Sequence, residues 1–195
     1  MIKLLSIRKN DKYELIVKGS KFISLVYRVY NTIEVKEIID KVKEEYHNAT
    51  HYCYGYVIDN DIKSSDDREP SKTAGLPILN QILGNNLNYT LIIVVRYFGG
   101  IKLGTGLLTR TYAEVARGVI SKDNIISLVN GYDITISFDY NNIKDIDYIL
   151  GNSKIIDKIF DNTITYNVLV TKDILDKLSN YNININKEVY INDDN

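Results

Sequence analysis

The spacing of hydrophobic residues changes twice within the first third of the chain. From Tyr13 to Val29, apolar and polar residues alternate on both sides of Lys18-Gly19-Ser20, which predicts two half-buried strands joined by a turn. Over residues 31–47 the apolar positions recur at helical spacing instead. Asn31 and Glu34 stand at the spacing of a capping box, so a helix is expected to begin here.

Strands and helices continue to alternate up to about residue 122. Apolar runs predict strands over residues 51–58 and 89–98, and the second run is continuous enough for both of its faces to be buried. Helices are expected over residues 73–86 and 107–120, and the polar stretch 59–72 is expected to be a loop. The expected core includes Leu15, Phe22, Ile39, Val42, Ile82, Ile93, Val95 and Val115.

The last third of the chain contains a second series of predicted strands and helices. Strands are expected over residues 131–140, 153–161, 163–170 and 183–191, and helices over 141–151 and 171–180, with Thr171 as a cap. The order βαββαβ is typical of a ferredoxin-like fold. The fold class is therefore predicted to be α+β, with domains over residues 1–122 and 127–192 and a boundary near Lys122-Asp123-Asn124.

Composition places the chain among globular proteins of a reducing compartment. Its 195 residues are 45% hydrophobic and 25% charged, and the single Cys53 excludes an internal disulfide framework. No apolar run approaches the roughly 18 residues of a membrane span. The first 15 residues turn polar too early for a secretory signal, so a cytoplasmic protein without membrane contact is expected.

Charge is unevenly distributed although the net charge is only -1. Residues 1–125 contain 18 Lys and Arg against 14 Asp and Glu, whereas residues 126–195 contain 6 against 11. All six arginines lie in the first part. This asymmetry indicates either compositional drift between two domains or a first domain that is suited to an anionic partner.

Four of the chain's 11 glycines lie within twelve residues, in "YFGGIKLGTGLL". We call residues 97–106 the glycine loop. It follows a predicted buried strand and precedes a predicted helix, a geometry in which backbone N–H groups bind anions. The sequence lacks both the P-loop and the dinucleotide-binding patterns. The alternative is that the glycines serve only a sharp turn and close packing.

Cations surround the glycine loop, and no acidic residue occurs between Arg96 and Arg110. The candidate anion or nucleic-acid contacts are Arg96, Gly99, Gly100, Lys102, Gly104, Thr105, Gly106, Arg110 and Arg117. We expect at least one glycine of the loop at positive φ. We also expect the following helix to begin at Thr105, with Thr105 as its N-cap.

A second polar segment, "DDREPSKTAG", precedes the helix expected over residues 73–86. We call residues 66–73 the acidic loop. Asp66, Asp67 and Glu69 are candidate Mg²⁺ ligands or groove residues, and the alternative is a solvated loop that complements the helix N-terminus. Ser71 and Thr73 are read as caps. We expect the two loops to be neighbours, with Arg96 or Lys102 facing one of the three carboxylates across a shared groove.

A third segment, "HNATHYCYGY", places His51 and Cys53 on the same face of a strand. Such a pair suits a nucleophile and its base, but a buried cysteine that packs as a small hydrophobe is the commoner case. Only two histidines and one cysteine occur, too few for a structural zinc site. No catalytic residue is therefore assigned.

Taken in order, "SKFIS", "HYCYGYVI", "DDREPSKTAGLPIL" and "VVRYFGGIKLGTGLLTRTYAEVA" resemble the YigZ/IMPACT family over about residues 18–122. The resemblance implies an N-terminal β-α-β domain similar to the second domain of a small-subunit ribosomal protein. It also implies a C-terminal ferredoxin-like domain similar to a late domain of elongation factor G. The family commonly has glycine where this chain has Arg68, Lys72 and Leu107.

The family resemblance implies a translation-linked or nucleic-acid-linked role and no agreed enzyme activity. The first hypothesis is a non-catalytic protein, without a cofactor, that binds RNA or the ribosome through residues 96–117. The second is a Mg²⁺-dependent enzyme that acts on a phosphorylated small molecule, with the glycine loop holding the phosphate. The third is a protein-interaction adaptor that uses the acidic second domain.

Overall fold

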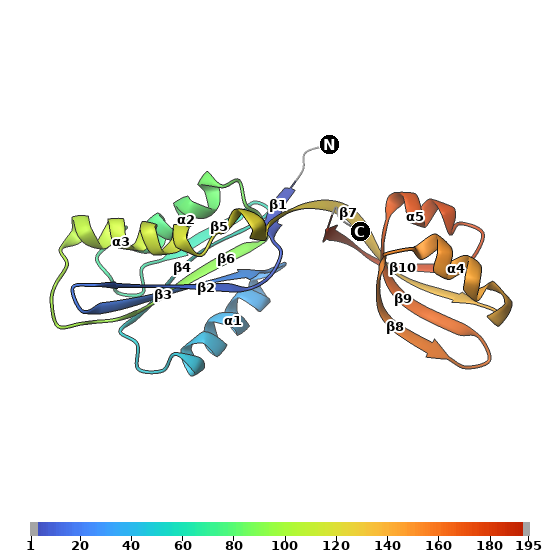
Figure 1. Cartoon of the computed structure of the whole chain (residues 1–195), viewed down its shortest axis with the longest axis horizontal. Helices are drawn as coiled ribbons and strands as arrows, with labels where there is room; N and C mark the ends of the chain where they lie inside the picture. The colour runs from blue at the N-terminus through green and yellow to red at the C-terminus, as the bar shows by residue number, and fades with distance from the viewer. Residues whose placement is uncertain (1–3, 193–195) are drawn as a thin grey trace. The chain divides into compact units, whose positions relative to one another are not determined.

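The computed structural model describes residues 4–192, which form two compact units, Leu4–Ile126 and the residues from Ser127 onward (Figure 1). The first unit contains β1 (Leu4–Ile7), β2 (Asp11–Val17), β3 (Ser20–Arg28), α1 (Thr32–Glu45), β4 (His51–Ile58), β5 (Asp61–Ser65), α2 (Gly75–Gly84), β6 (Thr90–Tyr97) and α3 (Thr105–Gly118). A 3-10 helix, η1 (Lys122–Asn124), follows where the domain boundary was expected. Each unit is described separately below.

The first unit is built on a five-stranded sheet with the strand order β2-β3-β6-β4-β5. Its four strand pairs are antiparallel. Lys18 and Gly19, both at positive φ, form the two-residue connection of the β2–β3 hairpin, as the turn prediction required. The continuous apolar run becomes β6, the central strand, and its residues Ile93 and Val95 are fully buried as predicted.

Helices cover both faces of this sheet, α2 and α3 on one and α1 on the other (Figure 1). Because side chains alternate along a strand, Ile92, Val94 and Arg96 of β6 share the α2/α3 face. Tyr112 and Val115 of α3 are fully buried there, at the helical spacing that the sequence predicts. The α2/α3 face therefore carries both the largest core cluster and the one buried arginine of the described residues.

Most local predictions for the first unit are confirmed. The α1 capping box is confirmed: the Asn31 side chain accepts from the N–H of Glu34, whose carboxylate accepts from the N–H of Tyr30. The expected loop over residues 59–72 was wrong in its first half, because residues 61–65 form the edge strand β5. Of the predicted core, Leu15 and Ile39 are only half-buried, since they lie on an edge strand and at the side of α1.

The second unit has the predicted element order βαββαβ. Its elements are β7 (Ile125–Phe138), α4 (Ile143–Leu150), β8 (Lys154–Phe160), β9 (Ile164–Thr171), α5 (Lys172–Lys177) and β10 (Asn182–Asn192), with a 3-10 helix, η2 (Tyr140–Asn142), before α4. Within this unit the strand order is β10-β7-β9-β8, and each of these pairs is antiparallel. Its core joins Ile134 and Ile136 to Tyr166 and Val168.

Two further findings concern helices. Thr171 precedes α5 as predicted, but its side chain makes no capping hydrogen bond in the described part of the chain. Within residues 4–192, no helix combines the length and the apolar character that a membrane crossing demands.

Candidate functional site

The acidic loop contacts the end of β6, directly before the glycine loop, through one ion pair between Glu69 and Arg96. The Glu69 Oε1 atom lies 2.5 Å from the Arg96 Nη1 atom. The prediction that Arg96 faces one of the three carboxylates is therefore confirmed. The two side chains are only 4% and 6% exposed, so the pair is buried.

Side chains from β3, β4, α3 and the start of the glycine loop contact this pair. The Tyr112 hydroxyl donates to Glu69 Oε1 over 2.8 Å, and the ring Nε2 of His51 lies 3.7 Å from the same oxygen. The Arg96 guanidinium lies over the rings of Phe22 and Phe98, at 5.3 Å and 5.6 Å from their centroids. Its buried Nε has no hydrogen-bond partner within the described chain.

His51 and Cys53 share a face of β4, but they do not form a catalytic pair. The Cys53 thiol is fully buried, donates to the carbonyl oxygen of Asp66 and has its sulfur 3.4 Å from the Tyr112 hydroxyl. Burial raises the pKa of the Cys53 thiol, so the reactive thiolate is disfavoured. The Nδ1 atom of His51 contacts the carbonyl oxygen of Asp67 at 2.8 Å. Both residues thus fasten the acidic loop to the sheet.

The three carboxylates of the acidic loop do not converge on one point. Asp66 accepts from the backbone N–H groups of Lys72, Ala74 and Gly75, and Asp67 accepts from that of Tyr52. No three His, Cys, Asp or Glu side chains in residues 4–192 are grouped so as to hold a metal ion.

The N-terminus of α2 is capped by a side chain that lies eight to nine residues earlier in the sequence. Asp66 Oδ1 accepts from the N–H groups of Ala74 and Gly75, the residues with which the helix begins. Reading Ser71 and Thr73 as caps was wrong, because the Thr73 hydroxyl donates instead to the carbonyl oxygen of Pro70. The negative charge of Asp66 also complements the helix dipole.

Three non-glycine residues of the acidic loop have backbone conformations with positive φ. Asp67, Arg68 and Lys72 have φ values of 39°, 69° and 62°. The family resemblance implies glycine at Arg68 and Lys72, and a positive φ is the conformation that glycine adopts most readily. Leu107, the third departure, is half-buried within α3 and needs no such conformation.

The glycine loop has a closely packed end and an open remainder. A Cβ atom at Gly99 would lie 1.9 Å from the backbone carbon of Gly19, so this glycine is needed for contact with the β2–β3 turn. Gly100 and Gly104 are at φ 86° and 75°, which confirms the prediction of positive φ. No described atom lies within 4 Å of a Cβ built at either position.

The helix α3 begins at Thr105 as predicted, but Gly104 and not Thr105 is its N-cap residue. No described side chain caps this end, because Gly104 has none and Thr105 is already helical. Gly106, in the first turn, faces open space apart from the Arg110 side chain at 4.0 Å. The first backbone N–H groups of α3 therefore lack a side-chain acceptor.

The predicted cations divide into one buried and three exposed side chains. Lys102, Arg110 and Arg117 are exposed, with Glu114 also exposed on α3, whereas Arg96 is inside the unit. The sequence prediction overlooked Phe98 and Ile101, which lie in the same segment of the chain and are 46% and 55% exposed. A signal for Phe98 was present: it stands two residues after Arg96 and thus continues the same strand face.

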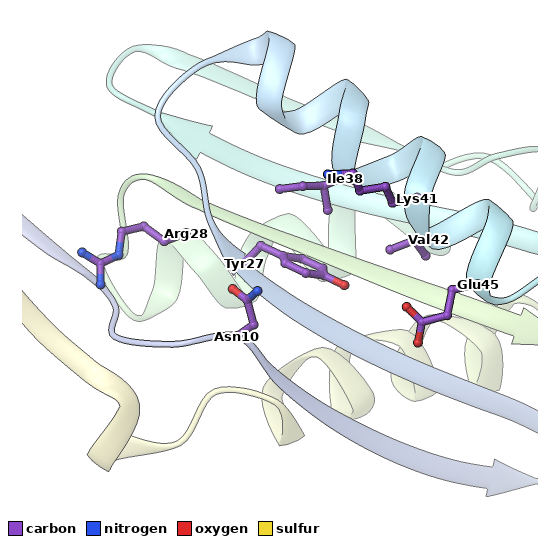
Figure 2. A pocket seen from close by; sticks show the side chains of 7 residues that line it. All are labelled: Asn10, Tyr27, Arg28, Ile38, Lys41, Val42 and Glu45. Atoms are coloured by element: carbon purple, nitrogen blue, oxygen red, sulfur yellow. The ribbon is translucent and has the colours of Figure 1, made fainter. Parts of the chain in front are cut away.

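Two grooves flank α1 on the opposite side of the sheet. One, of about 290 Å³, is lined by Tyr27 and Arg28 of β3, by the α1 side chains that include Lys41 and Glu45, and by Asn10 (Figure 2). The other, of about 400 Å³, lies between α1 and the tyrosines Tyr54 and Tyr56. None of the predicted site residues lines either groove.

The chain is similar to known proteins both in sequence and in fold. The model of the Impact N-terminal domain matches residues 18–120. "IMPACT family member YvyE" of Bacillus subtilis is 42% identical over 112 residues, which are 56% of this chain and 52% of that protein. "IMPACT family member YigZ" of Escherichia coli is 29% identical over 140 residues, 69% of each chain. The chain thus matches about half the length of the first relative.

One solved structure, described as the crystal structure of an hypothetical protein, covers 96% of this chain and 98% of its own chain. The TM-score is 0.67 at 24% sequence identity. This similarity establishes that the fold is shared.

Proposed function

Because the chain belongs to the Impact N-terminal domain family, we propose that it is a non-catalytic cytoplasmic protein that binds RNA or the ribosome in the regulation of translation. The proposed contact is the exposed end of α3 together with residues 100–106 of the glycine loop. It would take the phosphate groups of an RNA backbone.

The bare first turn of α3 carries this proposal. Glycine at Gly106 lowers helix stability by roughly 0.5–1 kcal/mol relative to alanine, and no close packing requires it there. The uncapped N–H groups and the helix dipole favour an anion at this end. Lys102 and Arg110 add two exposed positive charges without a neighbouring acid in the sequence between Arg96 and Arg110.

In this proposal the buried Glu69–Arg96 ion pair supports the RNA-binding surface but does not itself contact RNA. Arg96 is paired with Glu69 inside the unit, so in this proposal it positions the start of the glycine loop. Asp66 and Asp67 are occupied by backbone N–H groups, and the buried Cys53 thiol is poorly suited to nucleophilic attack. These roles favour a binding protein over the enzyme hypothesis.

For the two domains we propose the folds that the family resemblance implies. The domain of residues 1–122 would have the ribosomal-protein-type fold, and that of residues 127–192 the ferredoxin-like fold. The second assignment is supported by the order βαββαβ and by the strand order β10-β7-β9-β8.

The test is RNA binding by the full chain, measured as fluorescence anisotropy of a labelled RNA over a salt series. Replacing both Lys102 and Arg110 by Ala should weaken binding and reduce the slope of log affinity against log salt by about 1.4–1.8, the value for two phosphate contacts. The matched control is K36A/K43A, which removes two exposed lysines from α1 on the other face of the sheet.

If the two double variants lose affinity equally, binding is non-specific charge attraction and the proposed contact is wrong. If the unmodified chain binds no RNA even at low salt, the proposed function is wrong altogether.

A further inference from the structure

We propose that Phe98 is a stacking platform for an unpaired base, so that the preferred ligand is single-stranded and not duplex RNA. This inference rests on the RNA-binding function proposed above and names its substrate class. The apolar surface at Phe98 is otherwise unexplained, because an exposed aromatic ring at the end of a central strand stabilises little.

The ring of Phe98 is held in place from one side. The guanidinium of Arg96 lies 5.6 Å from the ring centroid, and Phe22 lies beyond it on the same cation. Arg96 is itself fixed by the ion pair with Glu69. The Arg96 guanidinium therefore contacts part of the Phe98 ring, and Phe98 as a whole remains 46% exposed.

The backbone around Phe98 is fixed as well. The N–H of Phe98 donates to the Thr50 hydroxyl over 3.0 Å, and the N–H of Gly99 donates to the Ser20 hydroxyl over 3.1 Å. Gly99 is pressed against Gly19. A ring on such a rigid support loses little entropy on binding, which favours stacking.

The surrounding charge selects the kind of ligand. Lys102 follows four residues later, and the sequence has no acidic residue from Phe98 to Arg110. An aromatic surface beside cations suits single-stranded nucleic acid, in which bases stack on the ring and phosphates meet the cations. A duplex hides its base faces and offers nothing to the ring. An acidic apolar peptide would also suit the charge but would gain nothing from the flat ring.

The experiment uses the full chain and two variants of Phe98. F98L keeps an apolar side chain but removes the aromatic face. F98W introduces the only Trp of the chain, so Trp fluorescence reports on this position alone. The probes are a 12-nucleotide oligouridylate and a 12-base-pair RNA duplex. The matched control is F160L, which alters another Phe, 56% exposed, in the second unit.

We expect F98L to weaken oligouridylate binding about tenfold, equivalent to about 1.4 kcal/mol of base stacking, and duplex binding less than twofold. F160L should bind both probes like the unmodified chain. Oligouridylate should quench the F98W fluorescence, and the duplex should leave it unchanged at equal occupancy.

Two results would overturn the inference, and they differ in their consequence. Equal effects of F98L on both probes, or an unquenched F98W, would remove the stacking platform and leave phosphate binding at α3 intact. Absence of salt-dependent binding of either probe to the unmodified chain would remove the proposed function, and the platform with it.

Discussion

The acidic loop and the glycine loop are linked by the Glu69–Arg96 ion pair, because Arg96 directly precedes the glycine loop, but their backbones differ. In the acidic loop, Asp66 and Asp67 accept hydrogen bonds from four backbone N–H groups. In the glycine loop, positions 100, 104 and 106 are free of close contacts, and the helix that follows has no side-chain cap among the described residues. The Asp66 and Asp67 carboxylates of the acidic loop are therefore occupied by backbone N–H groups, whereas the N–H groups at the start of α3 remain accessible.

This difference separates a supporting role from a binding role. A backbone whose donors are already occupied has nothing to offer a ligand, whereas bare N–H groups at a helix start attract an anion. The two loops also differ in the free-energy cost of their backbone conformations. The acidic loop holds three non-glycine residues at positive φ, whereas the glycine loop has glycine wherever φ is positive. The following predictions are ordered from the largest expected effect to the smallest.

The shared ion pair should be the most sensitive point of the first unit. Glu69→Gln should lower the free energy of unfolding by about 3–5 kcal/mol, because it leaves the Arg96 charge buried without a partner. Urea denaturation followed by circular dichroism measures the loss. Glu114→Gln, at an exposed position of α3, should change stability by less than about 0.5 kcal/mol. Similar small losses for both variants would contradict the supporting role of the pair.

Within the glycine loop, packed and open glycines should behave differently. Gly99→Ala should cost roughly 2–3 kcal/mol, because its Cβ would meet the Gly19 backbone at 1.9 Å. Gly100→Ala has open space and should cost only about 1 kcal/mol for its positive φ. The same denaturation assay compares the two. If Gly100→Ala were the more harmful change, the division of the loop into a packed end and an open remainder would be wrong.

Alkaline pH should reveal the buried thiol behind the acidic loop. Burial raises the folded pKa of Cys53 above its unfolded value near 8.5, so the protonated thiol favours the folded state. That stability is complete below pH 8.5 and decreases as pH rises, by up to about 1.4 kcal/mol per pH unit. Cys53→Ala should remove this decrease between pH 9 and 10. An unchanged pH slope in the variant would show that another group is responsible.

Replacing cations by glycine in the acidic loop should stabilise the protein. Arg68→Gly and Lys72→Gly should each add about 1 kcal/mol, because a side chain at positive φ costs about 1–2 kcal/mol and the freer unfolded chain offsets part of it. The control is Lys36→Gly within α1, which should destabilise by a similar amount. Destabilisation by both loop variants would mean that their cations make contacts that outweigh the backbone strain.

The sequence predicts more of the fold than of the site, and the residues show why. Alternation and apolar runs act locally, so they correctly placed β6, α3 and the element order of the second unit. The charges of Arg96 and Glu69 indicated that the two segments meet, but the burial of the pair depends on Phe22 and Tyr112, which come from β3 and α3. The alternative that the acidic loop complements the helix N-terminus is confirmed for Asp66, but the sequence did not single out this carboxylate, because its partners lie six to nine residues further on.

The smallest stability effect should give the sharpest test of the comparison between the loops. Gly106→Ala and Gly84→Ala both add a methyl group to a helix where the surroundings are open, so each should raise stability by roughly 0.5 kcal/mol. Only Gly106 lies at the bare start of α3, where a phosphate group would approach the backbone closely. Gly106→Ala should therefore weaken RNA binding about threefold while Gly84→Ala leaves it unchanged, both measured by anisotropy at fixed salt. If both variants become more stable and both keep full affinity, no ligand approaches the backbone at Gly106, and the open glycines need another explanation.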